Sequence, residues 1–477
     1  MMSYILLLMI VVPLAGAFFS LLSKYDKNYV PDNVYNVSIW IALTNIFLIL
    51  GAFSLMDIEK NGIQLVEKYH WLTEPEINIF LGADIFSMLL LFGVNFSFLI
   101  ASVCLEHSAD SPKNLITTQL LFNSFFNGYL LAADLISFYV FFAAMNIPLI
   151  MLISIYGKMH KKNIFMKFSL YSFVGIVFLL VAVVMIYIYK QGNIPLNTAG
   201  NLNLQGKLEY FVWFSIFLAF ISRLPIWPFH YWISSITSAL RHPLVFLCAN
   251  LLPLVGVYGF MRFWPNTVPA SIAVYTPYFE MICIVTMIFI SFVCYSHRDL
   301  RYKIFAYIAV YYLLFLIGVF LPTSSLKMNI GYSLFTFINI IVVLSFLVHH
   351  IENEKKRLNI HNHDGILCYM PRASLVLSLF ILAAIGLPIT PLFWNNFIII
   401  SEIFNYNLLL GALTIFSLFI VAFSLLEELY HMKDKNFALQ FQEGRDISVF
   451  QSLIYLLYLL ILLFSFFNPL WFVFRRV

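Results

Sequence analysis

Two ionisable residues inside one long apolar stretch are the positions where this sequence could do chemistry. Arg223 and His230 lie in the stretch 209–230, with Pro225 and Pro228 between them. Charged side chains are costly inside a lipid bilayer and occur there mainly along routes for ions or protons. A histidine can take up and release a proton, whereas a guanidinium stays charged. These residue types therefore indicate proton or ion movement, with Arg223 unable to act as a relay.

Three further ionisable residues, Asp84, Asp134 and Lys167, stand near the ends of expected helices. Together with Arg223 and His230 they are the candidate proton-path residues. Each also has a structural interpretation. The aspartates could make contacts at the lipid interface or between helices, Lys167 could be a cytoplasmic anchor, and His230 could pack and hydrogen-bond at a helix break. The sequence predicts no catalytic residues.

The composition indicates which elements must hold these residues. Of the 477 residues, 62% are hydrophobic and 10% are charged, against roughly 45–50% and about 25% in soluble domains. One soluble core cannot bury this excess, so much of it must face lipid. The net charge of +4 comes from Lys and Arg in short connections. That placement is typical of topology determinants and excludes a nucleic-acid-binding surface.

Apolar runs of membrane-spanning length recur along the whole chain, since a bilayer core of about 30 Å requires about 20 apolar residues per helix. They occur near 3–22, 34–55, 80–104, 115–132, 133–156, 166–189, 209–230, 240–262, 276–296, 303–322, 328–350, 372–400, 407–430 and 449–472. The sequence therefore predicts an all-α polytopic membrane protein with about 14 transmembrane helices in a single domain, 1–477. The first run has no preceding Lys or Arg, which indicates a membrane helix and not a signal peptide.

The distribution of Lys and Arg predicts the orientation in the membrane. Most of the 27 Lys and Arg residues fall in or beside the odd-numbered connections between the expected helices. Cytoplasmic connections carry the excess of these residues. We therefore expect a multi-pass protein of a bacterial inner (plasma) membrane with both termini in the periplasm.

Two of the expected helices contain residues that interrupt a helix. The seventh carries Pro225 and Pro228 near its end, and the twelfth carries Gly386, Pro388 and Pro391 in mid-run. Proline removes a backbone donor and clashes with the preceding turn, so both helices should be broken. In a membrane, freed backbone groups are tolerated only inside the protein or beside water.

Breaks that lie five helices apart predict inverted repeats, helices 4–8 against helices 9–13, as in secondary transporters. The first repeat would cover 115–262 and the second 276–430, with helices 1–3 in 1–114 and helix 14 in 449–472. The alternative is two ordinary proline kinks without a repeat.

No pattern for a cofactor or a metal stands out. The five cysteines lack the spacing of zinc, iron–sulfur or disulfide sites, and no Gly-rich phosphate loop precedes a helix. His361, His363 and Asp364 resemble metal ligands, but a structural zinc site generally needs four ligands. A solvated loop is the simpler interpretation, so we expect no metal, no nucleotide and no other cofactor on this chain.

Residues 220–263 carry a pattern that resembles a known family. The matching positions are Pro225, Pro228, Phe229, His230 and Trp232, then Leu252, Gly256, Tyr258 and Gly259. They resemble the P-x-x-P-F-H-x-W and G-x-Y-G runs of the antiporter-like subunits of respiratory complex I. Weaker matches keep the family's order and spacing from residue 69 to residue 397, at 69–71, 82–87, 138–148, 167–175, 298–301, 370–371 and 386–388. Together they favour subunit M, which is chain 4 in mitochondria.

The resemblance implies a proton path whose residues are substituted here. In the family, a helix-5 glutamate pairs with a helix-7 lysine, and a helix-8 lysine relays protons toward a helix-12 glutamate, with a histidine on helix 11. The resemblance aligns these five positions, in the same order, with Ala143, Arg223, Leu254, Asn396 and Asn339. Buried Lys and Glu can gain and lose protons. Alanine, leucine and asparagine side chains have no group that titrates, and arginine keeps its proton.

The resulting hypothesis is an antiporter-like subunit in the membrane arm of a proton-translocating NADH-quinone oxidoreductase. By the resemblance, its partners would be other membrane-arm subunits and the lipid bilayer, and the redox cofactors would belong to other subunits. It would be a non-catalytic, divergent paralogue whose own proton channel is impaired. The alternatives are a component of an Mrp-type cation/proton antiporter and a non-transporting membrane scaffold.

Overall fold

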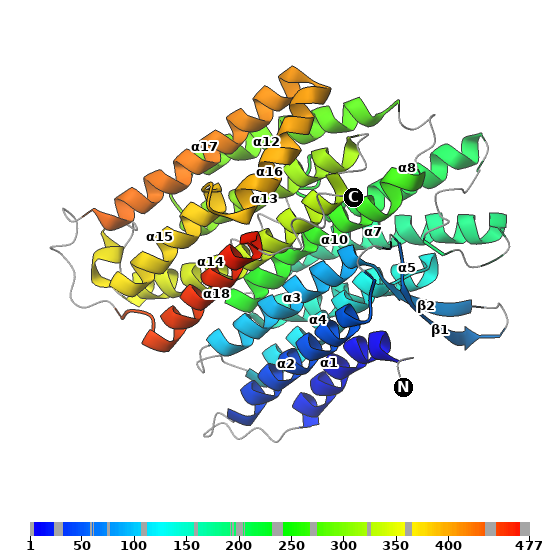
Figure 1. Cartoon of the computed structure of the whole chain (residues 1–477), viewed down its shortest axis with the longest axis horizontal. Coiled ribbons are helices and arrows are strands. Elements are labelled where there is room, and N and C mark those ends of the chain that lie inside the picture. Colours follow the sequence, from blue (N-terminus) through cyan, green and yellow to red (C-terminus); the bar gives the residue numbers. More distant parts are fainter. Residues whose placement is uncertain are drawn as a thin grey trace. The chain divides into compact units, whose positions relative to one another are not determined.

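The computed structural model in Figure 1 divides into two compact units. It describes residues 4–22, 32–57, 60, 62–73, 77–105, 112–156, 161–190, 192, 195–196, 204, 206–230, 242–267, 274–321, 326–357, 365–434 and 445–467. Unit 1 takes in residues 1–224 and 251–276, and unit 2 takes in residues 225–250 and 277–477.

Unit 1 is helical except for one hairpin of two antiparallel strands. Its elements are α1 (Ile5–Leu22), α2 (Asp32–Ser54), β1 (Leu65–Leu72), β2 (Ile77–Ala83), α3 (Ile85–Cys104), α4 (Pro112–Leu131), α5 (Leu135–Ala144), α6 (Asn146–Tyr156), α7 (Lys161–Lys190), α8 (Lys207–Ile221) and the second half of α10 (Pro243–Thr267).

Unit 2 consists of helices in the part that the structure describes. Besides the first half of α10, its elements are α12 (Thr276–Ser296), α13 (Leu300–Phe320), α14 (Leu326–Arg357), the short 3-10 helix η2 (Ile366–Tyr369), α15 (Pro371–Ile385), α16 (Pro391–Tyr406), α17 (Leu408–Lys433) and α18 (Val449–Phe467).

The predicted helical membrane fold is confirmed. Within the described residues, ten helices are long and apolar enough to cross a membrane. Every apolar run picked out from the sequence contains at least one helix. The total of about 14 spans stays a prediction, as do the inverted repeats and their boundaries.

Two boundaries differ from the sequence prediction. The run 80–104 begins as strand β2, and its helix starts only at Ile85, because Asp84 caps it: the carboxylate accepts a hydrogen bond from the Ser87 N–H. The run 133–156 is two helices, separated at Met145. Capping satisfies backbone donors that a helix start leaves free.

The hairpin, most of which lies between the predicted apolar runs 34–55 and 80–104, holds the start of α1. Glu67 on β1 is buried, and its two carboxylate oxygens accept hydrogen bonds from the N–H groups of Leu6 and Leu7 at 2.9 and 3.0 Å. Tyr69 donates a further hydrogen bond to the same carboxylate at 2.7 Å. A carboxylate at a helix N-terminus satisfies free donors and favours the helix dipole.

Both expected helix breaks are present. Helix α8 ends at Ile221, and turns follow up to His230. Helix α15 ends at Ile385, and the φ of 87° at the following Gly386 is a left-handed conformation that glycine adopts without strain. After a turn, α16 begins with Pro391, and proline fits the first helical position because no donor is needed there.

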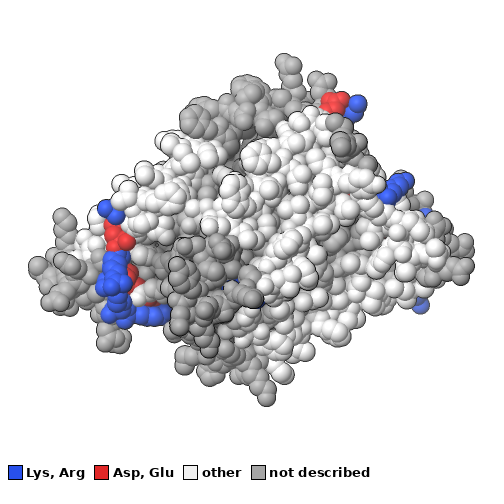
Figure 2. All heavy atoms as spheres, turned by 90° about the horizontal axis from the view of Figure 1, so that it is seen from below, with Lys and Arg blue, Asp and Glu red and all other residues white. Residues whose placement is uncertain are grey.

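The helices differ in how much of their surface can meet lipid. The apolar stretch of α13 is wholly buried, whereas only about a third of that of α17 is buried. Helix α12 has one exposed apolar side, with Tyr278, Met281 and Val285 each more than 60% exposed. On the face drawn in Figure 2, the described charged side chains gather at the margins and leave a broad uncharged area. Such surfaces suit a lipid environment.

Candidate functional site

Arg223 is a buried cation just beyond the end of α8. Its side chain is enclosed, with 2% of the residue exposed. The guanidinium lies 4.7 Å from the centre of the Phe142 ring, and Nη1 donates a hydrogen bond to the Ser172 hydroxyl at 3.1 Å. Nε and Nη2 have no hydrogen-bond partner. The charge is therefore held by an aromatic face and one hydroxyl.

Close packing of α7 against the end of α8 positions this cation. A Cβ atom built on Gly175 of α7 would lie 2.1 Å from the Ser222 hydroxyl and 3.2 Å from the Ala219 carbonyl oxygen. Only glycine allows that approach, which also brings Ser172 of α7 within reach of Arg223. The hydrogen bond from Arg223 Nη1 thus goes to a side chain of α7.

No carboxylate among the described residues forms an ion pair with Arg223. Phe142, and not its neighbour Ala143, presents its side chain to the guanidinium, and Ala143 is half-buried. Leu254, aligned with another family lysine, is fully buried. Among the described residues, Arg223 therefore has no carboxylate within ion-pair distance with which it could exchange a proton, and the Tyr129 phenol is the titratable group that interacts with it.

Asp84 is a structural residue in the described geometry. Its carboxylate receives two bonds from the Arg262 guanidinium, at 2.5 and 2.7 Å, and Arg262 Nε also donates to the Tyr258 hydroxyl. Burial alone would raise the pKa of Asp84, but the Arg262 charge and the Ser87 hydrogen bonds outweigh it and hold the pKa below its usual value. Asp84 therefore ties α3 to α10.

Asp134 is fully buried and serves as the N-cap of α5. Its carboxylate accepts hydrogen bonds from the N–H groups of Phe80, Ile136 and Ser137 at 3.0–3.1 Å, and from the Ser137 hydroxyl. This set of bonds fastens the hairpin to the start of α5. Such a carboxylate is already engaged in holding backbone donors.

The other two candidates lie in different surroundings. His230 is half-buried, its ring centre is 5.8 Å from that of Phe289 in an edge-on arrangement, and Nδ1 has no hydrogen-bond partner. Lys167 is half-buried on α7. The ring contact of His230 fits a packing role at the helix break.

Two asparagines take the remaining family positions in unit 2. Asn339 is fully buried on α14; its amide donates to the Phe335 carbonyl at 2.6 Å, and its oxygen accepts a hydrogen bond from the Tyr458 hydroxyl of α18. Asn396 on α16 is 6% exposed, and its amide oxygen has no partner. Asn339 therefore joins two helices and does not titrate.

A buried ion pair in unit 2 was missed by the sequence analysis. Lys303 of α13 and Glu428 of α17 lie 3.0 Å apart, with side-chain exposures of 3% and 7%. Lys303 Nζ also donates to the Ser424 carbonyl at 3.1 Å. In the sequence, each of the two residues was visible as a charge within an apolar run. Which charges pair depends on tertiary packing and could not be read from the sequence.

Glu280 of α12 is a second group that the sequence analysis missed. It is fully buried, and neither carboxylate oxygen has a hydrogen-bond partner. An isolated acid within an apolar run was again the signal, and its position near the start of the run made an exposed end equally plausible. Lys303, Glu428 and Glu280 are thus buried ionisable residues of unit 2, as are Glu352 and Glu354 of α14.

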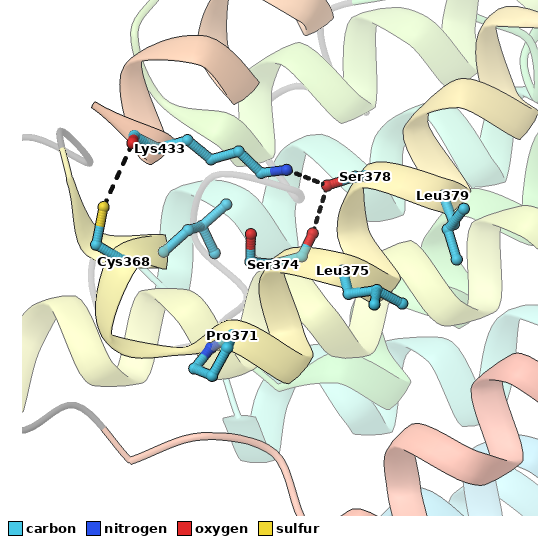
Figure 3. Close-up of a pocket in the computed structure, with 8 residues that line it drawn as sticks. Cys368, Pro371, Ser374, Leu375, Ser378, Leu379 and Lys433 are labelled. Atoms are coloured by element: carbon cyan, nitrogen blue, oxygen red, sulfur yellow. Dashed lines mark hydrogen bonds between the residues drawn. The ribbon is translucent and has the colours of Figure 1, made fainter. Parts of the chain in front are cut away.

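One surface groove lies beside η2, α15 and the end of α17, with a volume of about 500 Å³ (Figure 3). Lys433 Nζ reaches across it to the Ser378 hydroxyl at 2.7 Å, and the Cys368 thiol donates to the Lys433 carbonyl at 3.3 Å. Leu375 and Leu379 line its apolar part. Its described polar groups bind one another, so the groove adds no proton-accepting chain.

Metal binding finds no support in the described geometry. No group of three or more His, Cys, Asp or Glu side chains gathers there. The predicted loop residues His361, His363 and Asp364 lie outside the described residues. All five cysteines are free thiols, and Cys368 is the exposed one.

Comparison with known proteins identifies the family. The transmembrane family described as NADH:quinone oxidoreductase/Mrp antiporter matches residues 132–422, more than half of the chain. The chain belongs to this family. The match takes in Arg223, the Lys303 end of α13 and both broken helices, so the buried cations described above lie within the part of the chain that defines the family.

Relatives of this antiporter family cover most of the chain. NADH-quinone oxidoreductase subunit M of Rickettsia conorii is 26% identical over 411 residues, covering 83% of this chain and 82% of the relative. NADH-ubiquinone oxidoreductase chain 4 of Marchantia polymorpha is 25% identical over 413 residues, covering 85% and 81%.

Two solved structures share the fold. A chain of respiratory complex I from Thermus thermophilus matches with a TM-score of 0.84 and 20% identity, covering 96% of this chain and 94% of that chain. A chain of the membrane-bound sulfane sulfur reductase, an archaeal respiratory membrane complex, also matches with a TM-score of 0.84, at 17% identity. The antiporter-family fold of this chain is thereby shown.

Proposed function

We propose that this protein is an antiporter-like subunit in the membrane arm of a respiratory NADH:quinone oxidoreductase, and that its own proton path is impaired. The first part is supported by the family match and by relatives named subunit M and chain 4 that align along about four-fifths of their length. It is favoured over an Mrp antiporter component because both of these relatives carry the oxidoreductase name.

One observation carries the second part. The cation at the family's helix-7 position is a guanidinium held by the Phe142 ring and the Ser172 hydroxyl, with no carboxylate partner among the described residues. A guanidinium does not release its proton under physiological conditions. Leu254, Asn339 and Asn396 supply no replacement relay at the other aligned positions.

The remaining assignments belong to the same proposal. The protein would lie in a bacterial inner membrane with both termini in the periplasm, contact other membrane-arm subunits and lipid, and bind no cofactor itself. Chains of multi-subunit respiratory complexes share its fold, which supports such partners. A reporter domain that is active only in the periplasm can be fused to the C-terminus. The predicted orientation requires that this fusion be active.

The test of membership in a complex is affinity purification of the tagged full-length protein from native membranes in a mild detergent. We expect other respiratory subunits to co-purify in constant proportion. An unrelated tagged multi-pass protein is the control for non-specific carry-over. Recovery of this chain alone, or of the same set with the control, would contradict the assignment and favour a separate role.

A further inference from the structure

Glu280 in α12 is a buried acid with nothing to balance a negative charge. The residue has 0% of its surface exposed and lies one turn inside Thr276–Ser296. Both carboxylate oxygens lack a hydrogen-bond partner. A carboxylate without partners in apolar surroundings is so costly that the group takes up a proton instead.

Glu280 lies on a face of its helix from which its side chain cannot extend along the lipid surface to water. It lies on the inward side of α12 with Cys283, Ile284 and Met287, at the spacing of one helix face. The lipid-exposed side is formed by other residues, such as Met281 at 63% exposure. The side chain is therefore enclosed by protein and cannot snorkel to the interface.

The immediate surroundings of Glu280 are uncharged. The neighbouring Phe279 packs its ring 6.2 Å from that of Phe320 of α13. The titratable groups near the carboxyl are the Cys283 thiol on α12 and the Tyr406 phenol at the end of α16, and both groups are ordinarily neutral at pH 7. No Lys, Arg or His of the described chain lies within ion-pair distance.

These surroundings also argue against a metal ion as the ligand. Ca²⁺ and Mg²⁺ take about six or more oxygen ligands. The carboxylate of Glu280 and the Tyr406 hydroxyl together supply three oxygens at most. The described residues contain no cluster of His, Cys, Asp or Glu that would add more. A proton satisfies the carboxyl group without further ligands.

Glu428 in the same unit is a buried acid whose negative charge is balanced by a cation. It is also buried, with 5% of the residue exposed, but Lys303 lies 3.0 Å away and balances its charge. The two glutamates therefore form an internal comparison: similar burial, one with a cation and one without.

We propose that Glu280 is a proton-binding site of unit 2, with its carboxyl group neutral in the folded protein at neutral pH. The proton comes from water and returns to water when the carboxyl group ionises, so no other reactant is needed. The proposal concerns one side chain and does not depend on membership in a respiratory complex or on an impaired proton path.

The first test uses dicyclohexylcarbodiimide, which reacts with protonated carboxyl groups in apolar surroundings. The carboxyl oxygen adds to the carbodiimide carbon, the acid proton moves to nitrogen, and rearrangement leaves a stable N-acylurea on the side chain. Purified full-length protein in lipid nanodiscs would be treated at pH 7 and digested for mass spectrometry. We expect an adduct at Glu280 and none at Glu428. Equal labelling of both would overturn the proposal.

Infrared spectroscopy provides a second test that does not need reagent access. A protonated carboxyl group has a carbonyl band separate from that of a carboxylate. We expect this band in the wild type at pH 7, its loss in Glu280→Gln, and its retention in Glu428→Gln. Identical spectra of the wild type and Glu280→Gln in this region would refute the proposal, whatever the labelling result.

Thermal unfolding checks that the variants remain folded. Glutamine has nearly the shape of a protonated glutamate, so Glu280→Gln should keep the unfolding temperature of the wild type. Glu428→Gln should lower it, because it leaves the Lys303 ammonium buried without an anion. A marked rise in unfolding temperature for Glu280→Gln would mean that the wild-type side chain carries a charge, and would contradict the proposal.

Discussion

At the scale of single residues, the surroundings of a buried charge decide what the charge does. Glu428 has a cation beside it, Glu280 has none, and Arg223 rests on an aromatic ring. The first is a fixed structural link, the second is proposed to bind a proton, and the third keeps its charge without a relay partner. Sequence alone shows three charges in apolar runs and cannot separate these cases.

The Lys303–Glu428 pair provides a stability prediction. Replacing one partner, as in Lys303→Met or Glu428→Leu, should lower the free energy of unfolding by about 3–5 kcal/mol, because the other charge is left buried. The double variant should recover most of this loss. Denaturant unfolding in mixed micelles, followed by tryptophan fluorescence, would measure all three.

The exposed pair Lys60–Asp57 is the matched control, with side-chain exposures of 74% and 49%. Lys60→Met should leave the unfolding curve unchanged, since exposed ion pairs contribute little. The double variant at Lys303 and Glu428 could instead lose as much unfolding free energy as the two single variants together. That result would show that the two residues act independently.

Asp84 leads to a prediction about pH. Its pKa is lower in the folded protein than in the unfolded chain, so the unfolded chain binds more protons between the two values. The pair with Arg262 therefore stabilises the protein fully above the ordinary aspartate pKa of about 3.9 and loses this effect as the pH falls through the folded-state value.

Asp84→Asn should keep the helix cap but remove the charge pair. We expect a loss of about 1.5–3 kcal/mol near pH 7, and a gap to the wild type that narrows in acid. Unfolding temperatures across pH 3–8 would measure it, with Asp57→Asn as the exposed control. If the difference in unfolding temperature between the wild type and Asp84→Asn widens toward low pH, the predicted direction of the Asp84 pKa shift is wrong.

At the scale of elements, Gly386 tests the break between α15 and α16. Its φ is 87°, and a Cβ atom built on it would have the Phe393 Cα as its nearest neighbour, at 3.7 Å, so space is available and only the backbone resists. Gly386→Ala should therefore cost about 1–2 kcal/mol of unfolding free energy. Gly386→Asn should cost less, because asparagine tolerates the left-handed region better.

Gly51, within α2, is the matched control for this substitution. A Cβ there would meet only Ile5 Cδ1 at 3.8 Å. Gly51→Ala should stabilise the protein by about 0.5–1 kcal/mol, since alanine loses less backbone entropy in a helix. The same measurement serves both variants, and equal effects at the two glycines would contradict a conformational role for Gly386.

Helices were easier to predict than their ends. Apolar length locates each span, because lipid demands it, and proline and glycine locate both breaks. The hairpin was not predicted. Its Glu67 caps α1, which lies about sixty residues earlier in the chain, and a contact over that separation leaves no local sequence pattern. Met145 separates α5 from α6, and Pro148 in the first turn of α6 was a local signal for this break that the sequence prediction did not use.

At the scale of the whole molecule, composition and ordered motifs were enough to predict the membrane fold and the family, and both are confirmed. The candidate site was harder. Asp84 and Asp134 were expected near helix ends and lie there, but the links that they make to other elements depend on partners far along the chain, Arg262 and Phe80. Contacts of that kind leave no local pattern.

Proton movement by the entire chain is the last prediction. Proteoliposomes that contain the protein, loaded with a pH-sensitive dye and given a pH gradient, should show no more proton flux than protein-free vesicles. The guanidinium of Arg223 cannot alternate between two protonation states, and the aligned positions around it carry no acid. An added uncoupler should collapse the gradient and prove that the vesicles are sealed. Arg223→Ala should leave the baseline unchanged. Strong flux in the wild type that disappears in Arg223→Ala would instead make this residue part of a working path, in which a neighbouring group or water performs the proton exchange that arginine cannot.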